Sequence, residues 1–473
     1  MSLHPIYVHK YDLHAPCSPS PLKAIATPGP IMEPFSRLAS LPKGTPADIE
    51  GVAFPSSMLD WVDSIPNDLL EVVSIIAQSQ GGVWVVGGSV RQGLGGVEPQ
   101  DYDLATTLQP QQIMEIFGSN NSIDIGAKYG TVTVRIESSL NWYEVTTLRC
   151  DQEYLDGRRP ESVIFGNSLL EDLERRDLTI NAMAVDLARQ ELYDPFGGLD
   201  DLNSGILQAV GDASTRLSED GLRVMRAYRF MDQGDAGIWM PDDDLSVALK
   251  ECQHMLENVS IERIWQELRR IISSKHAAKV LNQMSQDGVL NTIFEGYEYN
   301  LEGQNEITEI SENLLEVRLA MMFKDGNSND LMKRLKVPKS IINDVISLIN
   351  CISHVPDANS IEELRLYRAV LGDRLDQQLI CESALKTSLI QDVKSSLDSL
   401  PENRAGVSPI ADGNWIAEVT GLSKGIKLGR LKEWLHRIQI EEDLVSLEEI
   451  ESHINHLPWQ EGNPTTWPRF RWP

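Results

Sequence analysis

The pattern of apolar residues changes once along the chain, near residue 202, and this change limits the architectures that the sequence can form. Between Trp61 and Asp201 the apolar residues form short runs or alternate with polar ones, as in strands. Beyond Leu202 they recur every three or four residues, the spacing of helices that pack through one face. We therefore predict an α+β domain with a mixed sheet, followed by an all-helical remainder of more than one unit.

The individual elements follow from the same two periods. Strands are predicted at 83–86, 102–105, 131–136 and 143–148, and helices at 261–272, 314–323, 341–349 and 431–440. Residues 1 to about 55 are rich in Pro, Ser and Ala without either period, which predicts a mostly disordered extension. A chain of 473 residues, 41% of them hydrophobic, exceeds one compact core, so several domains are expected.

The charge and the cysteines restrict the class of protein. A formal charge of −28 argues against a protein that coats nucleic acid by bulk attraction, so any RNA contact needs local basic patches. An acidic enzyme with a small-molecule substrate fits the charge equally well. The five cysteines are scattered and never spaced as CxxC, which indicates neither disulfides nor a zinc site. Since no apolar run reaches the roughly 20 residues of a membrane span, we expect a cytoplasmic protein with no membrane partner.

Three acids are predicted to meet on the strands of the first domain. Asp101 and Asp103 are two residues apart at a strand, so both side chains point to one face. Glu144 is polar among apolar neighbours of a later strand and would join the same cluster. Two solvated acids at a strand edge would give the same DxD pattern, but crowded carboxylates are costly unless a metal compensates them. We predict that Asp101 and Asp103 bind Mg²⁺ and that Glu144 is the third acid.

A glycine turn follows the first strand, where Gly87, Gly88 and Ser89 are succeeded by Arg91. Backbone N–H groups in such a turn can approach a phosphate, although many Gly-Gly turns are only structural and no complete phosphate-loop motif is present. Together with the acids, the turn predicts nucleotidyl transfer. In that chemistry one metal activates a 3′-hydroxyl, a second neutralises the leaving pyrophosphate, and donors hold the triphosphate.

The segment 175–184 combines two cations with hydrogen-bonding groups. Arg175 and Arg176 can contact phosphate or ribose, and Asp177 can accept from a ribose hydroxyl, with Asn181 beside it. A capped, solvent-facing helix start would show the same residues. The functional interpretation favours an RNA-type nucleotide.

A second acid and base cluster occurs at 219–226. On one helix Glu219, Asp220, Arg223 and Arg226 would fall within an arc of about 120°. An ordinary salt-bridge ladder has the same spacing. Alternatively, Asp220 and Arg223 present an acceptor and a donor to the Watson–Crick edges of cytosine and adenine. A protein template would then replace a nucleic-acid one.

Seven segments resemble, in order, the motifs of the class II tRNA nucleotidyltransferase and poly(A) polymerase family. They are VVGGSVR, QDYDLATT, YEVTTLR, LEDLERRDLTINAMA, LYDPFGGLDDL, SEDGLRVMRAYRF and SIERIWQELRRI, and they cover residues 83 to about 272. The resemblance implies a head of DNA-polymerase-beta-like nucleotidyltransferase fold and a curved helical neck, body and tail. The expected boundaries are 56–201 for the catalytic head, 202–272 for the base-selecting neck, 273–370 for the body and 371–473 for the tRNA-binding tail.

The resemblance also implies a reaction: template-independent addition of C, C and A to the 3′ end of tRNA from CTP and ATP, with two Mg²⁺ ions. Addition of A alone and poly(A) synthesis stay open because the head motifs are shared, and a non-catalytic tRNA-binding protein is a more distant alternative. By position, Asp220 and Arg223 would select the base and Arg226 would support the nucleotide. Gln92 replaces the customary acid after Arg91, which puts an orienting salt bridge there in doubt.

Three further features concern subtype and partner. No histidine precedes an aspartate, so a phosphohydrolase domain of the HD type is not expected. The segment 150–171, which includes Asp156–Pro160, corresponds to a flexible loop of relatives that add the terminal A. Basic residues of the tail would contact the acceptor stem and elbow of tRNA, with no role for DNA, although such helix faces are often only solvated. These residues are Lys424, Lys427, Arg430 and Lys432, with Arg437 and a second cluster at 333–339.

Overall fold

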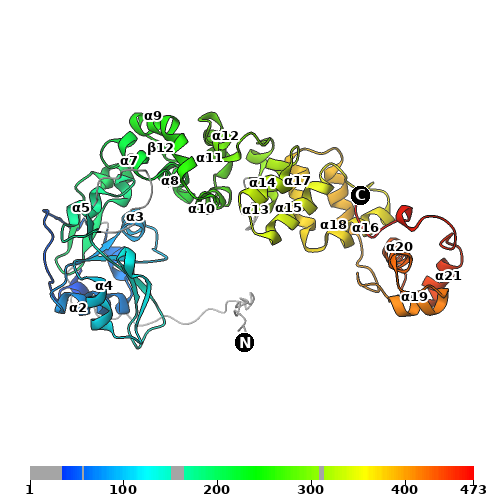
Figure 1. Cartoon of the computed structure of the whole chain (residues 1–473), viewed down its shortest axis with the longest axis horizontal. Coiled ribbons are helices and arrows are strands. Elements are labelled where there is room, and N and C mark those ends of the chain that lie inside the picture. The colour runs from blue at the N-terminus through cyan, green and yellow to red at the C-terminus, as the bar shows by residue number, and fades with distance from the viewer. Residues whose placement is uncertain (1–34, 56–57, 151–163, 308–313) are drawn as a thin grey trace, which may run out of the picture.

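The computed structural model describes residues 35–55, 58–150, 164–307 and 314–473, and these form an elongated arc (Figure 1). A sheet domain lies at one end of the arc, and helices follow in chain order toward the other end. We use head for β1 to α6, neck for β11 to α10, body for α11 to α18 and tail for α19 to α21. Within the described ranges, none of the helices combines the length and the apolar character that a bilayer crossing requires.

The head is built on a mixed sheet of eight strands in the order β1-β10-β9-β2-β3-β6-β5-β4. Neighbouring strands are antiparallel except β3 and β6, which are parallel. The four predicted strands are confirmed as β2, β3, β5 and β6. The bounds are Val52–Ala53 (β1), Val83–Val86 (β2), Asp103–Thr106 (β3), Ser122–Gly126 (β4), Thr131–Val134 (β5), Tyr143–Thr147 (β6), Ala184–Asp186 (β9) and Glu191–Tyr193 (β10), with a separate pair Arg149–Cys150 (β7) and Ile164–Phe165 (β8).

Both faces of this sheet are covered, which explains why β2 is apolar at four successive positions. Val83 and Val85 pack into a cluster on one face, while Trp84 and Val86 pack into a cluster on the other. Alternate residues of a strand point to opposite faces, so a strand buried on both sides has no polar position. The helices of the head are Leu59–Ser64 (α1), Asn67–Gln78 (α2), Gly88–Leu94 (α3), Pro110–Phe117 (α4), Leu169–Glu174 (α5) and Gly198–Ser204 (α6).

Residues 35–55 belong to the head, so the predicted disordered extension is wrong for this stretch. Leu38 is fully buried, and Arg37 donates to the carbonyl oxygens of Val62 and Ile65 at 2.8 and 2.7 Å. The short strand β1 pairs with β10 at the edge of the sheet. Neither a two-residue strand nor an arginine that binds backbone oxygens leaves a periodic pattern in the sequence. Residues 1–34 lie outside the described residues.

The neck contains a parallel pair of short strands and four helices. Their bounds are Ile206–Leu207 (β11), Ala213–Glu219 (α7), Leu222–Met231 (α8), Met240–Pro241 (β12), Asp243–Glu251 (α9) and Ile261–Ile272 (α10). The continuous helix predicted across 219–226 is wrong, because α7 ends at Glu219 and Asp220 is extended, with φ −145° and ψ 107°. The cause is a tertiary contact: a Cβ on Gly221 would lie 2.2 Å from the carbonyl oxygen of Met255. The chain therefore turns at this position.

The body and tail are helical, as predicted. The body contains Ala277–Gln286 (α11), Val289–Phe294 (α12), Leu315–Phe323 (α13), Ser328–Arg334 (α14), Lys339–Cys351 (α15), Ile361–Leu371 (α16), Leu375–Ala384 (α17) and Ile390–Ser399 (α18). The tail contains Gly413–Thr420 (α19), Ile426–Glu442 (α20) and Leu447–Ile454 (α21). Each of the four helices named from the sequence coincides with one of these helices or with α10.

The hydrophobic clusters divide the helical part differently from the predicted boundaries. One cluster runs from Leu178 to Leu348, through the neck and into the body, so no separate core begins at residue 273. A cluster that contains Cys351, Tyr367 and Val393 joins α15, α16 and α18 across the predicted boundary at 370. The tail has its own cluster, which extends from residue 411 to residue 467.

Candidate active site

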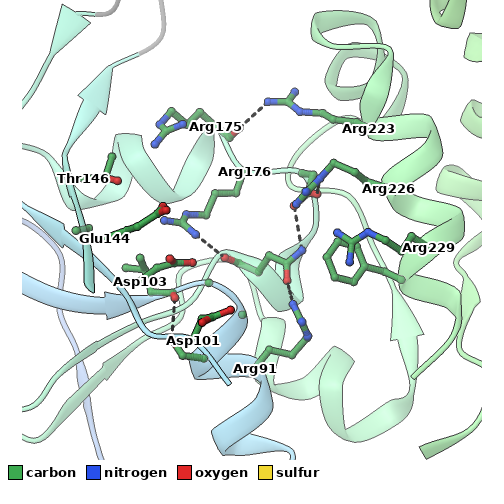
Figure 2. Close-up of a pocket in the computed structure, with 18 of the residues that line it drawn as sticks. Arg91, Asp101, Asp103, Glu144, Thr146, Arg175, Arg176, Arg223, Arg226 and Arg229 are labelled. Atoms are coloured by element: carbon green, nitrogen blue, oxygen red, sulfur yellow. Dashed lines mark hydrogen bonds and ion pairs between the residues drawn. The ribbon is translucent and has the colours of Figure 1, made fainter. Parts of the chain in front are cut away.

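A cavity of about 1040 Å³ lies where the head meets the neck, and Figure 2 shows the residues around it. Strands β2, β3 and β6 and helix α3 contribute from the head, and α8 and α10 contribute from the neck. Every catalytic and nucleotide-binding residue predicted from the sequence lines this cavity. They are Gly87, Gly88, Ser89, Arg91, Asp101, Asp103, Glu144, Arg175, Arg176, Asp177, Asn181, Asp220, Arg223 and Arg226.

The three predicted acids meet at the head end of the cavity. The parallel register of β3 and β6 sets Asp103 directly beside Glu144. Asp101 lies two residues before Asp103, and Tyr102 between them is buried, so alternation keeps the two carboxylates on the cavity side. Burial at this position raises the pKa of the Asp103 carboxyl, and the charges of Glu144 and Asp101 raise it further. The cluster therefore carries more negative charge than its surroundings compensate.

The acids fit a magnesium site in which the bound substrate supplies further ligands. Among the described residues, no group of three His, Cys, Asp or Glu side chains is arranged as a metal cage. Mg²⁺ in nucleotide enzymes usually takes one or two carboxylates, with phosphate oxygens and waters as its other ligands. Within the described part of the chain, no hydrogen bond or ion pair engages Asp101, Asp103 or Glu144, so their oxygens are available to a cation.

The glycine turn has the geometry that its sequence predicted. Gly87 has φ +72°, and a Cβ there would lie 3.1 Å from an Nη1 atom of Arg176, so a side chain would be strained and crowded. Ser89 is buried, and its hydroxyl donates to the carbonyl oxygen of Val86 at 3.1 Å. The Ser89 hydroxyl thus closes the turn, and the backbone is the part of the turn that faces the cavity.

Arg91 extends from this turn toward the neck. Its guanidinium donates to Oδ1 of Asn181 and lies 4.8 Å from the centre of the Phe230 ring. Burial lowers the pKa of Arg91 to about 10, and the positive charge of Arg229 contributes to that shift. Gln92, which replaces the customary acid, also lines the cavity. Arg91 is therefore oriented by Asn181 and Phe230.

A buried carboxylate that the sequence prediction missed holds Arg175 and Arg176. Asp172 accepts from Arg175 at 2.5 Å and from Arg176 at 3.2 Å, and it is 1% exposed. Burial alone would raise the pKa of Asp172, but the two arginine charges hold it below its usual value. Of this fixed pair, the Arg176 guanidinium lies beside the carboxylates of Glu144 and Asp103, and Arg175 lies farther from them (Figure 2).

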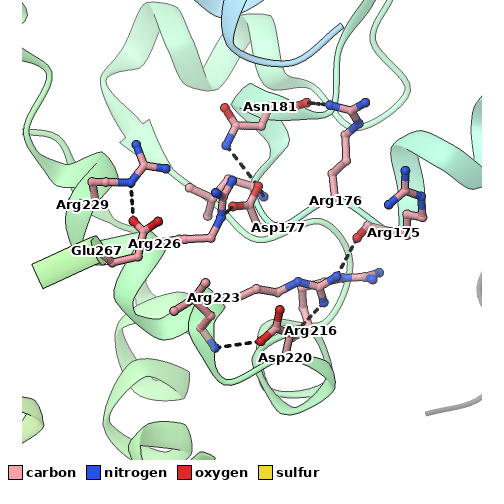
Figure 3. A network of polar contacts seen from close by, with 12 residues as sticks. Arg175, Arg176, Asp177, Asn181, Arg216, Asp220, Arg223, Arg226, Arg229 and Glu267 are labelled. Atoms are coloured by element: carbon pink, nitrogen blue, oxygen red, sulfur yellow. Dashed lines mark hydrogen bonds and ion pairs between the residues drawn. The ribbon is translucent and has the colours of Figure 1, made fainter. Parts of the chain in front are cut away.

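Asp177 is engaged by protein groups and is not the free acceptor that the sequence suggested. It accepts from Nε of Arg226 at 2.6 Å, from Nδ2 of Asn181 at 3.1 Å and from the backbone N–H of Leu178 at 2.9 Å (Figure 3). Burial opposes its charge, yet Arg226 and these donors hold the pKa of Asp177 well below its usual range. Asp177 therefore positions Arg226 and Asn181.

Asp220 lies in the break between α7 and α8, and Arg223 lies in the first turn of α8. The Asp220 carboxylate accepts from Arg263 at 2.9 Å and from the N–H of Leu222 at 3.0 Å. Arg223 forms an ion pair with Glu219 and donates to the carbonyl oxygen of Arg175 at 2.7 Å. Both side chains line the cavity in fixed orientations.

The sequence prediction missed a row of polar residues on α8 and α10, although the helical spacing of those on α10 can be seen in the sequence. Arg263, Gln266, Glu267 and Arg270 recur at three- and four-residue intervals on an amphipathic helix and line the cavity. Arg229 of α8 stacks 4.0 Å from the centre of the Phe230 ring and pairs with Glu267 at 2.6 Å. With this row, the described lining contains nine arginines and seven carboxylates, a formal excess of two positive charges.

A second groove, of about 770 Å³, is also lined by the same three acids. Its lining includes the exposed side chains of Leu140 and Trp142 on the turn between β5 and β6. It also includes Glu98 with Asp101, Asp103 and Glu144, and among the described residues no lysine or arginine lines it. The two approaches to the acids therefore differ in charge.

The basic residues predicted for RNA contact in and before α20 lie far from this site, at the opposite end of the arc (Figure 1), and the second predicted cluster, at 333–339, lies in the body. Lys424 precedes α20 and is exposed, whereas Lys427, Arg430 and Lys432 lie on α20 and are partly buried. Arg430 pairs with Glu433 at 2.7 Å, and Lys427 donates to the carbonyl oxygen of Gln460 at 3.1 Å. The predicted loop at 156–160 lies outside the described residues.

Comparisons with known proteins agree with this geometry. The family model described as poly A polymerase head domain matches residues 83–208, and the model described as probable RNA and SrmB-binding site of polymerase A matches residues 241–301. The first match spans β2 to β11, and the second spans α9 and α10 and continues into the body. The cavity is lined from both matched segments.

Proteins that resemble this chain beyond these two segments are CCA-adding enzymes. That of Ligilactobacillus salivarius is 33% identical over 313 residues, which are 63% of this chain and 74% of the relative. That of Bacillus velezensis is 31% identical over 376 residues, 74% of this chain and 93% of the relative. The crystal structure of the Bacillus stearothermophilus CCA-adding enzyme in complex with CTP matches with a TM-score of 0.67 and 26% identity, over 82% of this chain and 96% of that one.

Proposed function

We propose, since the chain belongs to the CCA-adding enzyme family, that it adds C, C and A to the 3′ end of tRNA from CTP and ATP. The observation that carries the proposal is the presence, in one cavity, of three carboxylates that form no hydrogen bond or ion pair with the described residues and of an arginine-rich wall. In the reaction the 3′-oxygen of the RNA attacks the α-phosphorus of the nucleotide, and pyrophosphate leaves as the bond to its bridging oxygen breaks.

Asp101 and Asp103 would hold two Mg²⁺ ions, with Glu144 as the third acid beside them. Bound there, Mg²⁺ supplies activation of the 3′-hydroxyl and neutralisation of the leaving pyrophosphate. Burial, together with the neighbouring charges of Glu144 and Asp101, raises the pKa of Asp103 and supports this assignment, because a divalent cation stabilises the charged carboxylates. The backbone pairing of β3 with β6 keeps Asp103 and Glu144 side by side.

The triphosphate would lie against the glycine turn, beside the arginines held by Asp172. Gly87 and Gly88 let the backbone approach phosphate oxygens, and Arg175 and Arg176 present guanidinium groups that suit them. The Ser89 hydroxyl closes the turn by donating to Val86, and Asn181 orients the Arg91 guanidinium. Asp177 and Asn181 keep Arg226 beside the nucleotide.

Asp220 and Arg223 would select the base. A carboxylate accepts from the exocyclic amino group of cytosine or adenine, and a guanidinium donates to the neighbouring ring nitrogen. Uracil and guanine present the opposite pattern at these positions and would be rejected. The ion pairs that fix Asp220 and Arg223 support a rigid template of this kind.

The tRNA would extend from the cavity along the arc. We propose that Lys424, Lys427, Arg430 and Lys432 contact its elbow and that the neck and body face its acceptor stem. The distance of α20 from the acids along the arc supports a contact with a part of tRNA remote from the 3′ end (Figure 1).

Incorporation of labelled CTP and ATP, separately and together, tests the reaction on tRNA transcripts that lack CCA, end in C or end in CC. Three added residues on the first transcript, with dependence on Mg²⁺ and loss in EDTA, are expected. Addition of A only to the transcript that ends in CC would identify an A-adding enzyme, and a long tail would identify a poly(A) polymerase. Failure to incorporate either nucleotide would overturn the proposal.

A further inference from the structure

The neck side of the cavity carries a group of side chains that the proposed reaction does not use. We call the group formed by Arg229, Arg263, Gln266, Glu267 and Arg270 the neck wall. All but Arg229 lie on α10, and the row from Arg263 to Arg270 covers about 10 Å of helix axis. Arg270 is an exposed arginine of the row, with 63% of its side chain accessible.

The neck wall contains more positive charge than its own acid neutralises. Glu267 is buried and accepts from Arg229 at 2.6 Å and from Arg270 at 3.3 Å, so one carboxylate serves two guanidinium groups. The guanidinium groups of Arg91, Arg226 and Arg229 all lie within 5.4 Å of the centre of the Phe230 ring. Guanidinium groups bind phosphate oxygens through two parallel hydrogen bonds, so this group of arginines suits a phosphate.

The position of the neck wall distinguishes this anion from the triphosphate. In Figure 2 Arg229 lies on the opposite side of the cavity from Asp103 and Glu144, and in Figure 3 Arg229 and Glu267 lie on the opposite side from Arg175. The triphosphate must lie at the acids for transfer to occur. A second phosphate at the neck wall would then belong to the other substrate.

The charge of the second groove at the acids supports the same assignment. This groove is lined by Glu98, Asp101, Asp103 and Glu144, with no cationic side chain among the described residues, and it would repel a phosphodiester backbone. The neck wall attracts one. Arg263 also pairs with Asp220, so the row begins at the residue proposed to read the base.

We infer that the neck wall binds a backbone phosphate near the 3′ end of the tRNA, with Arg270 as the principal contact and Glu267 as the residue that orients Arg229 and Arg270. The inference rests on the proposed function. The segment that contains α10 matches the model described as a probable RNA-binding site, and the inference specifies which residues of α10 bind RNA and which part of the RNA they contact, separate from the site of the nucleotide.

Adjacent arginines on α10 provide a matched test. Arg270 lines the cavity, whereas Arg269 is exposed on another face of the helix. Arg270→Ala should raise the KM for a tRNA transcript that lacks CCA about fivefold to tenfold. It should change the KM for CTP less than twofold, and Arg269→Ala should change both constants less than twofold. The slope of log(kcat/KM) for tRNA against log salt should decrease by about 0.7 in Arg270→Ala, one contact for a single strand.

Arg270→Glu should raise the KM for tRNA further than Arg270→Ala, because it reverses the charge at an exposed position. A larger effect of Arg270→Ala on the KM for CTP than on that for tRNA would overturn the inference, and so would equal effects of Arg269→Ala and Arg270→Ala or no effect of either. Absence of incorporation by the unaltered chain would instead overturn the proposed function itself. Thermal unfolding of each variant verifies that the fold is retained.

Discussion

The cavity contains two sets of carboxylates that differ in their partners. Among the described residues, Asp101, Asp103 and Glu144 on the sheet have no ion pair, and burial and mutual repulsion raise the pKa of Asp103. Asp172 and Asp177 are each held by arginines, which keep their pKa values low although both are buried. A carboxylate without a partner is costly to the fold and is retained for a ligand, whereas a paired one orients its arginine. The difference separates residues for chemistry from residues for positioning.

The largest effect is expected at the unpaired acids. Asp101→Ala should lower kcat for CTP incorporation about 10³-fold or more, because it removes a ligand of the ions that stabilise the transition state. Binding of tRNA should be retained. Glu115→Ala, at an exposed acid of α4, is the control and should leave incorporation unchanged. Turnover of Asp101→Ala at the rate of the unaltered chain would remove Asp101 from the metal site.

At the paired acids the main effect should be on stability. Asp177→Asn leaves Arg226 without its ion-pair partner, and since that arginine is one-third exposed we expect the free energy of unfolding to fall by about 2–3 kcal/mol. Urea unfolding measures this change. Asp200→Asn, at an exposed position of α6, is the control. A variant as stable as the unaltered chain would show that the Asp177 pair does not hold the neck to the head.

The stability contributed by Asp177 should depend on pH in a defined direction. Its pKa is lower in the folded protein than in the unfolded chain, so its contribution is complete above the unfolded value of about 4 and is lost as pH falls toward the folded value. The difference between Asp177→Asn and the unaltered chain should be constant from about pH 5 to 8 and should shrink below about pH 4. A difference that grows on acidification would contradict the pairing.

The smallest effect is expected in the tail, where Lys424 is exposed and Lys432 is partly exposed. Lys424→Ala and Lys432→Ala should each raise the KM for tRNA about twofold to threefold, since an exposed charge contributes about 0.5 kcal/mol. The effect should diminish at high salt. Lys394→Ala on α18 is the control. Steady-state kinetics at two salt concentrations measures both quantities, and an effect equal to that of Lys394→Ala would leave α20 as ordinary solvated surface.

The sequence predicted the chemical end of the cavity better than the positioning end. Alternation placed Asp101 and Asp103 on one face, and the apolar neighbours of Glu144 identified its strand, because both signals are local. The adjacency of Asp103 and Glu144 depends on the parallel pairing of β3 and β6, which the spacing alone does not specify. The prediction that the acids meet is nevertheless consistent with that pairing.

The positioning end depends on contacts between distant segments, which a single sequence does not reveal. The buried carboxylates of Asp177 and Glu267 pair with Arg226 and Arg229, which lie 49 and 38 residues away in the chain. The arginine partners of Asp172 are only three and four residues away, so the sequence shows that pairing but not the burial of Asp172. The turn at Asp220 arises from the close approach of Gly221 to Met255, whereas the sequence pattern across 219–226 predicts one continuous helix. The beginning of the head was missed because Arg37 binds backbone oxygens, which no hydrophobic period records.

Applying one chemical change to one acid of each set tests the distinction most directly. Single-turnover incorporation of CTP into tRNA without CCA, measured beside thermal unfolding, compares Asp103→Asn with Asp177→Asn. We predict that Asp103→Asn loses the chemical step about 10³-fold with an unchanged or higher unfolding temperature, because it removes a repelled charge. Asp177→Asn should unfold at a lower temperature than the unaltered chain. Below that unfolding temperature it should still incorporate CTP at a measurable rate. Retained chemistry in Asp103→Asn with a lowered unfolding temperature would contradict the account.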